Sequence, residues 1–408
     1  MPPSDSDYFF QTSHSVAETN RKAQKSKNTQ GFPIRLPSKL LAIHADPSDP
    51  DVVFIAESVG NVRRIAIEVG EIPPFATGDT THIYRGPSTP ATSLALSSDG
   101  QTIYAGCWDK SIWSWDTTTC KGGRRFRGHT DFVKCLLCFR ASDGGLGGAG
   151  GKDVLVSGSA DTSVIAWNVS TGEKLHVLNG HTRGVLALAV DPATPTSIGK
   201  DGDGQDGGSR DVMVFSAASD PHIRRWKIKR DLTSAEEVDA ETPVLQHDTS
   251  VNSLFFDEDQ DLWTASSDGT AKCLSRERRW AADTVLTHGD YVRGVVVDEI
   301  GGWVITAGRD EDLKVWERGS GKLWHTYSGH FEEITACLLL SRQRLVTVGI
   351  DQTLRTWSLR ADELGKAKKE AEHAVDGTGS QEQTGEKQKE SMLTEEEERE
   401  LAELMDDD

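Results

Sequence analysis

The chain has 408 residues, a formal net charge of −19 and six cysteines with no framework spacing. We expect neither a membrane protein nor a secreted one, because no apolar stretch could span a bilayer and no signal segment begins the chain. Scattered cysteines then indicate a reducing compartment, the cytoplasm or the nucleus. The acidic balance argues against direct nucleic-acid binding, which depends on Lys and Arg.

In chain order, we expect a disordered arm over residues 1–31 and a short strand over the apolar run at residues 32–36. Residues 40–67 contain three further apolar runs that predict strands, with no aspartate in register between them. From residue 105 onward the apolar residues alternate with period two, which is typical of strands.

A spacing of residues recurs six times from residue 105 onward. A small residue is followed after four positions by Asp, and six positions later by a large apolar residue. The six copies are Ala105/Asp109/Trp115, Ser157/Asp161/Trp167, Ser216/Asp220/Trp226, Thr264/Asp268/Leu274, Thr306/Asp310/Trp316 and Thr347/Asp351/Trp357. In five copies a histidine precedes the small residue: His129, His181, His247, His288 and His330. An internal repeat of this length indicates one supersecondary unit stacked many times.

The chemistry of the repeat is that of a buried hydrogen-bond network. An Asp in a tight turn beside a buried strand needs partners, and the His, the hydroxyl and the Trp indole N–H supply them in series. We therefore interpret these residues as structural rather than catalytic or metal-binding. Four copies carry all four members, which we call tetrads: His129-Ser157-Asp161-Trp167, His181-Ser216-Asp220-Trp226, His288-Thr306-Asp310-Trp316 and His330-Thr347-Asp351-Trp357.

The pattern resembles the WD-repeat (tryptophan–aspartate repeat) β-propeller family. Its repeat opening is matched at Gly128-His129, Gly180-His181 and Gly329-His330, and the Trp-Asp pair itself stands at Trp115-Asp116. The resemblance implies an all-β fold, a seven-bladed propeller over residues 32–360. The family closes its ring by lending an N-terminal strand to the last blade, which assigns that role to residues 32–36.

Glycine-rich stretches at residues 145–150 and 200–208 imitate a dinucleotide fingerprint and a calcium loop. Neither has the structural context or the ligands required, so both are interpreted as insertions between the first two strands of a blade. A third insertion, residues 229–242, favours a helical turn over residues 232–238. Cys135 and Cys138 are interpreted as buried strand residues, and we expect no metal, cofactor or small-molecule site.

Residues 361–408 contain 17 acidic and 6 basic side chains. We expect a disordered acidic linker over residues 361–390. Residues 391–408 instead predict a short acidic helix, because Thr394 and Glu397 form a capping-box pair. Its small apolar stripe, which is either a fraying surface or a docking peptide for a partner, consists of Leu401, Leu404 and Met405.

In WD-repeat proteins the partner surface is usually the face that carries the turn before each Asp and the start of each first strand. By position the turn residues are Trp108, Ala160, Ser219, Ser267, Arg309 and Ile350, and the strand starts are Phe132, Gly184, Ser250, Tyr291 and Glu333. Arg183 and Arg293 add positive charge to the same rim. Aromatic residues and arginine anchor interfaces, so we expect partner binding by Trp108, Phe132, Arg183, Tyr291, Arg293, Arg309 and Ile350.

These observations favour a non-catalytic protein–protein interaction scaffold, a subunit or adaptor of a multiprotein complex. One alternative is a substrate receptor of a cullin-RING ubiquitin ligase. Such receptors carry Trp-Asp-x-Arg, whereas this chain has Trp357-Ser358-Leu359-Arg360 without the acidic residue. A second alternative is a ribosome-assembly or RNA-processing factor. An enzyme is disfavoured, since the regularly placed histidines are committed to the tetrads and the others form no spaced set.

Overall fold

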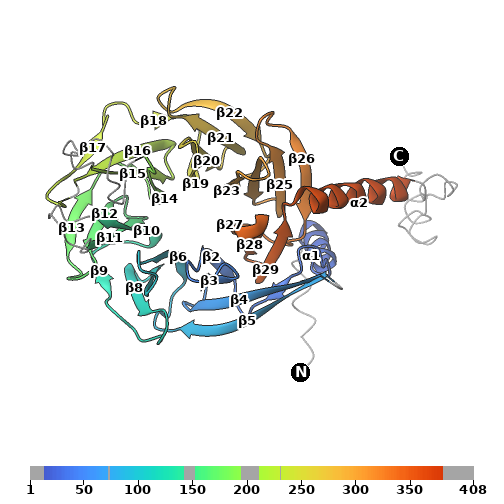
Figure 1. Cartoon of the computed structure of the whole chain (residues 1–408), viewed down its shortest axis with the longest axis horizontal. Helices are drawn as coiled ribbons and strands as arrows, with labels where there is room; N and C mark the ends of the chain where they lie inside the picture. The colour runs from blue at the N-terminus through green and yellow to red at the C-terminus, as the bar shows by residue number, and fades with distance from the viewer. Residues whose placement is uncertain (1–12, 72–73, 142–151, 194–210, 230, 380–408) are drawn as a thin grey trace, which may run out of the picture. The chain divides into compact units, whose positions relative to one another are not determined.

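The computed structural model describes residues 13–71, 74–141, 152–193, 211–229 and 231–379. By its internal contacts the chain divides into two units, residues 1–360 and residues 361–408. In the first unit seven antiparallel sheets follow one another around a central axis (Figure 1). The expected seven-bladed, all-β propeller is therefore confirmed.

Each of the first three blades has four strands, which pair antiparallel in chain order from the axis outward. The first blade consists of β2 (Leu40–Ala45), β3 (Val52–Glu57), β4 (Val62–Glu71) and β5 (Pro74–Tyr84). The second consists of β6 (Ala91–Leu96), β7 (Thr102–Cys107), β8 (Ser111–Asp116) and β9 (Phe126–Arg127). The third consists of β10 (Val133–Ala141), β11 (Lys152–Ser159), β12 (Val164–Asn168) and β13 (Lys174–Leu178).

The last four blades continue the same order. The fourth consists of β14 (Val185–Val190), β15 (Val212–Ala218), β16 (His222–Ile228), β17 (Ala235–Val238) and β18 (Val244–Leu245). The fifth consists of β19 (Val251–Phe256), β20 (Leu262–Ser266), β21 (Thr270–Ser275) and β22 (Ala281–Thr287). The sixth consists of β23 (Val292–Asp298), β24 (Trp303–Gly308), β25 (Asp312–Glu317) and β26 (Leu323–Ser328). The seventh consists of β27 (Ile334–Leu340), β28 (Arg344–Gly349), β29 (Thr353–Ser358) and β1 (Ile34–Arg35), with a 3-10 turn η2 (Ser341–Gln343) between β27 and β28.

The ring closes through β1, as the family resemblance implies. Ile34 pairs with Leu354 and Arg35 with Thr353, so the N-terminal strand completes the last blade. Arg355 is fully buried behind this junction and donates from its guanidinium to the backbone carbonyls of Asn28 and Gln30. Because a guanidinium binds backbone carbonyls only as a donor, Arg355 holds the segment that leads into β1.

The apolar core lies between neighbouring blades rather than inside any one of them. Val154 and Val164 of the third blade, for example, pack in one buried cluster with Val212 and Val214 of the fourth. The middle strands are covered on both faces, so the residues of β3 are buried without alternation. This is why the sequence shows continuous apolar runs there.

The outer strand of the fourth blade differs from the prediction. Residues 232–238 do not form a helical turn, because β17 pairs with β16 from Arg225 to Ile228. The same strand also pairs with β18 at His222 and Ile223. A seven-residue strand is long enough for two partner segments, so the insertion adds one strand instead of a helix.

Two segments for which we expected disorder contain helices: α1 (Ser13–Lys25) lies within residues 1–31, and α2 (Ala361–Gly379) within residues 361–390. In α2 the strong helix formers Ala, Glu and Lys dominate, and Asp362 and Glu363 in its first turn complement the helix dipole. In α1 basic side chains gain carboxylate partners on the propeller. Residues 391–408, with the predicted helix, lie outside the described residues.

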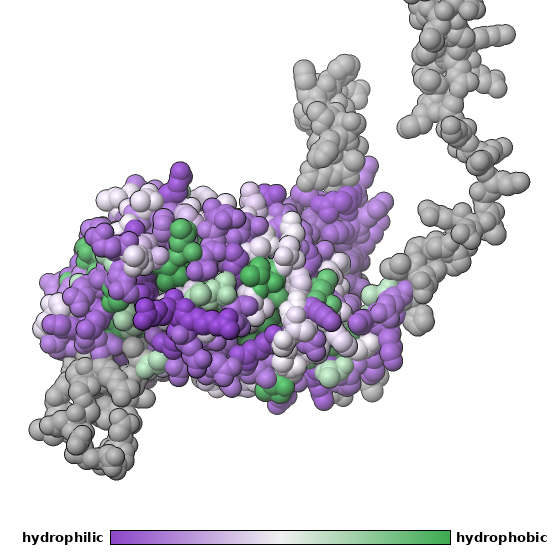
Figure 2. Space-filling view, turned by 90° about the horizontal axis from the view of Figure 1, so that it is seen from above, coloured by the Kyte–Doolittle hydropathy of each residue, from purple (hydrophilic) through white to green (hydrophobic). Residues whose placement is uncertain are grey.

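The side of the molecule shown in Figure 2 carries hydrophobic residues in small separate groups among mostly hydrophilic ones. Large exposed apolar side chains on the outer strands are Val177, Leu245, Val285, Leu323 and Trp324. Apolar side chains scattered in this way are ordinary for a folded protein.

Candidate functional site

The structure brings the four members of each predicted tetrad together in one hydrogen-bonded chain. In the third blade the Trp167 indole N–H donates to Ser157 Oγ over 2.8 Å, and Ser157 Oγ lies 2.7 Å from His129 Nε2. His129 Nδ1 in turn lies 2.9 Å from the Asp161 carboxylate. A neutral histidine protonated on Nδ1 satisfies every group: Trp donates to Ser, Ser to His, and His to Asp.

The other three tetrads repeat this chain. His181 and His330 use the same two ring nitrogens as His129, with the His330 contacts both at 2.8 Å. In the sixth blade the ring is reversed, with His288 Nδ1 at 2.8 Å from Thr306 Oγ1 and Nε2 at 3.0 Å from Asp310. The tautomer there must be the opposite one, but the direction of donation is unchanged.

The carboxyl groups of the tetrads are held in their charged form. Burial would raise the pKa of Asp161, but hydrogen bonds from His129 and Ser163 lower it well below its usual range. The pKa of Asp351 is lowered in the same way, against burial, by His330 and Thr353. Burial also lowers the pKa of His330, which favours the neutral ring. The network of the seventh blade is thus built around an ionised carboxylate and a neutral imidazole.

Two repeats depart from the tetrad and show how it is replaced. In the fifth blade His247 still joins Thr264 and Asp268 at 2.8 Å each, and only the indole is missing. In the second blade the Asp109 carboxylate has no histidine and instead accepts from the Trp113 indole at 2.9 Å and the Arg125 guanidinium at 2.7 Å. Arg125 also lies over the Trp113 ring. The sequence signal for this substitute was a second Trp four residues after the Asp.

A second recurring carboxylate was missed by the sequence reasoning. At the opposite ends of the first strands stand buried aspartates: Asp46, Asp191, Asp257 and Asp298. Asp191 is bound by Arg276 of the fifth blade, and Asp257 by Arg318 of the sixth. These pairs link neighbouring blades. An acidic residue directly after an apolar run in four blades was the signal that could have found them.

The predicted turn residues and strand starts lie together on one face, and a backbone hydrogen bond joins them in every blade. The N–H of each turn residue donates to the carbonyl of its own blade's strand start over 2.8–3.1 Å. The pairs are Ser58→Lys39, Trp108→Pro90, Ala160→Phe132, Ser219→Gly184, Ser267→Ser250, Arg309→Tyr291 and Ile350→Glu333. We call the surface formed by these residues the turn face.

Over the second to fourth blades the turn face carries an aromatic pair. Trp108 stacks on Phe132, with ring centroids 4.9 Å apart and an angle of 12° between the rings. Trp108 is 39% exposed and Phe132 is half-buried, so part of the stack faces solvent. Arg183 is exposed beside the start of β14. The structure thus places these three predicted residues in one sector of the face.

Over the sixth and seventh blades the other predicted residues form a separate group. The Arg309 guanidinium lies 4.3 Å from the centre of the Tyr291 ring, and its Nε is 3.5 Å from Asp290. Arg293 is paired with Glu333. Ile350 is half-buried. Leu401, Leu404 and Met405 lie outside the described residues, so their predicted role stays a prediction.

Helix α1 is ion-paired to the sixth and seventh blades. Arg21 donates twice to Glu311 over 2.8 Å, and Lys25 reaches the same carboxylate at 2.7 Å. Lys22 binds Glu332 over 3.0 Å. Glu311 lies in the turn between β24 and β25, two residues after Arg309, so this described contact of α1 is beside the turn face of the sixth blade.

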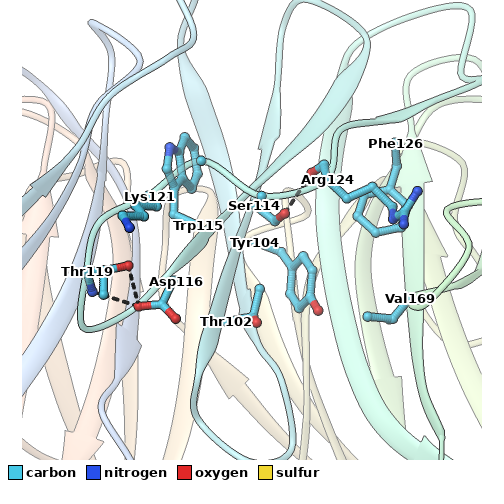
Figure 3. A pocket seen from close by; sticks show the side chains of 12 residues that line it. Thr102, Tyr104, Ser114, Trp115, Asp116, Thr119, Lys121, Arg124, Phe126 and Val169 are labelled. Carbon is cyan, nitrogen blue, oxygen red and sulfur yellow. Dashed lines mark hydrogen bonds between the residues drawn. The ribbon is translucent and has the colours of Figure 1, made fainter.

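A further hollow lies away from the turn face. It has a volume of about 330 Å³, lies on the second blade and shares no residue with the turn face (Figure 3). Its carboxylate, Asp116, accepts hydrogen bonds from Thr118 and Thr119 in its own turn. Among the described residues no group of three or more His, Cys, Asp or Glu is arranged to hold a metal ion. No helix in the described part of the chain is long and apolar enough to cross a membrane.

Comparison with known proteins gives the family. The model of the WD domain, G-beta repeat, matches residues 78–116. An uncharacterized WD repeat-containing protein of Schizosaccharomyces pombe is 30% identical, with 100% of both chains covered. The guanine nucleotide-binding protein subunit beta of Arabidopsis thaliana is 24% identical over 69% of this chain and 73% of its own length. The nuclear distribution protein nudF of Aspergillus niger is 28% identical over 52% of this chain and 42% of its own.

Propellers of this kind serve in general as protein-interaction scaffolds and are typically not catalytic. The repeat, the seven closed blades and the full-length similarity agree with one another. The chain belongs to the WD-repeat family of β-propeller proteins.

Proposed function

We propose that this protein is a non-catalytic scaffold subunit or adaptor of a multiprotein complex, and that its turn face holds segments of partner proteins. The observation that supports this most is the set of exposed aromatic and arginine side chains at positions that a backbone hydrogen bond fixes in every blade. Rigid elements that present aromatic side chains lose little conformational entropy on binding. Such residues are the usual anchors of protein interfaces.

The chemistry of the thiols supports a place in the cytoplasm or the nucleus. All six cysteines are free and buried or half-buried. Burial raises the pKa of Cys135 and of Cys337 to about 12, so neither is a reactive thiolate at neutral pH. Free structural thiols persist where the compartment is reducing.

The test is purification of the tagged full-length protein from cells, with mass spectrometry of what is retained. Trp108→Ala removes one anchor of the turn face, and a double variant, Tyr291→Glu with Arg309→Glu, reverses the other. We expect each to weaken retention of turn-face partners by roughly thirtyfold, the usual cost of losing an interface anchor. Trp324→Ala is the matched control, because Trp324 is also 39% exposed but lies on the outer strand β26.

Partners that remain bound to both turn-face variants, or that are lost with Trp324→Ala instead, would place the binding site elsewhere. Melting temperatures of all variants check that the fold is intact.

The same purification with a chain ending at residue 390 tests the proposed second contact through Leu401, Leu404 and Met405. We expect that shortened chain to lose a different set of partners, because the proposed stripe is removed while the turn face is unchanged.

A further inference from the structure

Every blade carries a β-bulge at the same place. The pairing between the first and second strands skips one residue at the second position of the first strand in all seven blades. A bulge leaves the extra residue outside the ladder and re-aims its side chain. The seven bulge residues line the central channel: Leu41, Thr92, Lys134, Leu186, Asn252, Arg293 and Thr335.

The polar bulge residues bind the next blade, with one exception. Thr92 donates to the Val133 carbonyl and Asn252 to the Val292 carbonyl, each over 2.7 Å. Thr335 donates to the Leu40 carbonyl over 2.9 Å. Arg293 is paired with Glu333. In the described part of the chain, Lys134 forms no hydrogen bond or ion pair, although it occupies the same position.

The Lys134 ammonium lies among aromatic rings and beside a hollow. It is 5.5 Å from the centre of the Trp108 ring and 5.8 Å from that of Phe132. Lys134 and Arg183 both line a hollow of about 450 Å³, with Ala160, Thr162, Thr182, Gly184, Leu186 and Ser219. Arg183 likewise has no oxygen partner among the described residues. No carboxylate lines this hollow in the described structure.

The electrostatic surroundings of Lys134 also indicate a cation whose charge is incompletely compensated. Burial lowers its pKa, the charge of Asp131 raises it and the charge of Arg293 lowers it. A half-buried ammonium that no carboxylate binds directly is incompletely compensated. The net charge of the whole chain is −19, so this positive sector is a local exception on an acidic protein.

We propose that this hollow binds an acidic segment of a partner protein, with carboxylates placed between Lys134 and Arg183 and an apolar side chain against the exposed edge of Trp108. The proposal rests on the scaffold function proposed above and names the chemistry of the partner. Two cations in one hollow, without ion-pair partners among the described residues, and an aromatic platform near Lys134 complement a short peptide that carries Asp or Glu next to a large apolar residue.

The experiment uses a library of random twelve-residue peptides displayed on phage and selected on the immobilised full-length protein, with prior depletion on the Lys134→Glu variant. We expect selected peptides to combine Asp or Glu with Trp, Phe or Leu. Kd values of synthetic copies, measured by fluorescence anisotropy, should rise about tenfold for Lys134→Gln, Arg183→Gln and Trp108→Ala. Lys134→Arg keeps the charge and should bind within a few-fold of the wild type.

Arg278→Gln is the matched control. The Arg278 side chain is a 65% exposed cation on the fifth blade outside the turn face, and it is already paired with Asp283, so the Kd should change less than about twofold. Binding should weaken when NaCl rises from 50 to 500 mM, because part of it is between exposed charges. Melting temperatures confirm that each variant is folded.

Recovery of peptides without acidic residues, affinities indifferent to Lys134→Gln, or no selected peptide at all would overturn the proposal. Competition by a single-stranded oligonucleotide that exceeds competition by the acidic peptides would overturn it in favour of a nucleic-acid site. These failures are distinct from a failure of the scaffold function. If the scaffold function fails, cellular partners would stay bound to the turn-face variants, whatever peptides are selected.

Discussion

A tetrad aspartate joins two loops that are distant along the chain. Asp351 accepts from His330 at 2.8 Å, from the Thr353 hydroxyl at 2.8 Å and from the Thr353 N–H at 2.9 Å. His330 precedes the first strand of the blade, whereas Asp351 lies in the turn between the second and third strands and Thr353 begins the third strand. The carboxylate therefore fixes the turn relative to the segment that precedes the first strand. Its removal leaves several buried donors without an acceptor.

We expect Asp351→Ala to lower the free energy of unfolding by about 3–5 kcal/mol, the cost of removing one partner from a buried charged network. Urea denaturation followed by circular dichroism measures the change. Glu236→Ala is the control, since the Glu236 side chain is 66% exposed and its substitution should change stability by less than about 0.5 kcal/mol. Equal stability of the two variants would contradict the network interpretation.

Among the elements, α1 is joined to the propeller by ion pairs. The Glu311 side chain is 7% exposed and receives both Arg21 and Lys25, whereas Glu332 is 31% exposed and receives Lys22 alone. Burial would raise the pKa of Glu311, but hydrogen bonds from Arg21 and Lys25 lower it. Two of these three basic side chains of α1 thus bind the same buried carboxylate.

Glu311→Gln should free α1 from the propeller, because it removes the charge that binds two basic side chains. We expect trypsin to cleave after Arg21, Lys22 or Lys25 roughly tenfold faster or more, since cleavage tracks the population of the detached helix. Peptide mass spectrometry over a time course gives the rates. For Glu332→Gln the increase should stay within about threefold, since that pair is partly exposed to solvent. A helix bound mainly by apolar contacts would show no such difference.

For the whole molecule, the five histidine-bound aspartates make stability depend on pH. Burial opposes the shift, but hydrogen bonds from the histidines lower the pKa of Asp161, Asp220, Asp268, Asp310 and Asp351 in the folded protein. The unfolded chain then binds more protons than the folded one below an ordinary carboxyl pKa of about 4. The contribution of these groups is complete above that pH and is lost as pH falls toward their folded pKa values.

His330 acts in the same direction at higher pH. Burial lowers its pKa below the ordinary 6.5, so the unfolded state takes up the extra proton. We expect the urea concentration at the midpoint to decrease slightly as the pH is lowered through about 6.5, and to decrease steeply as the pH is lowered through about 4. Midpoints measured from pH 8 to pH 3 test this, and Asp161→Asn should show a shallower loss in the acid range. Parallel curves for the two proteins would show that the carboxylate is not held in its charged form.

The blades could be predicted because their chemistry recurs. The spacing of His, Asp and Trp marks the strands and the turn in every complete copy, and β1 follows from the need to close the ring. Helix α1 could not be predicted in the same way. Its basic side chains pair with Glu311 and Glu332, about three hundred residues away along the chain, so the reason for its order is not local.

The positions of the residues in the candidate site could be predicted from the sequence, but their ion-pair partners could not. The turn residues and strand starts follow from the repeat, so Trp108 and Phe132 could be named. The bulge that places Lys134 at the channel depends on strand register, which the sequence pattern does not show. That Arg309 and Arg293 already have carboxylate partners, while Lys134 does not, emerges only from the packed structure.

Ring closure through β1 also has a consequence for biosynthesis. The two strands that meet, β1 and β29, are separated by about 320 residues of chain. A ribosome adds roughly 5–20 residues per second, so Ile34 waits on the order of half a minute before Leu354 is made. A nascent product that stops short of residue 353 leaves the closing strand without its ladder. Its open edges are then available to other chains, which makes such fragments prone to aggregate.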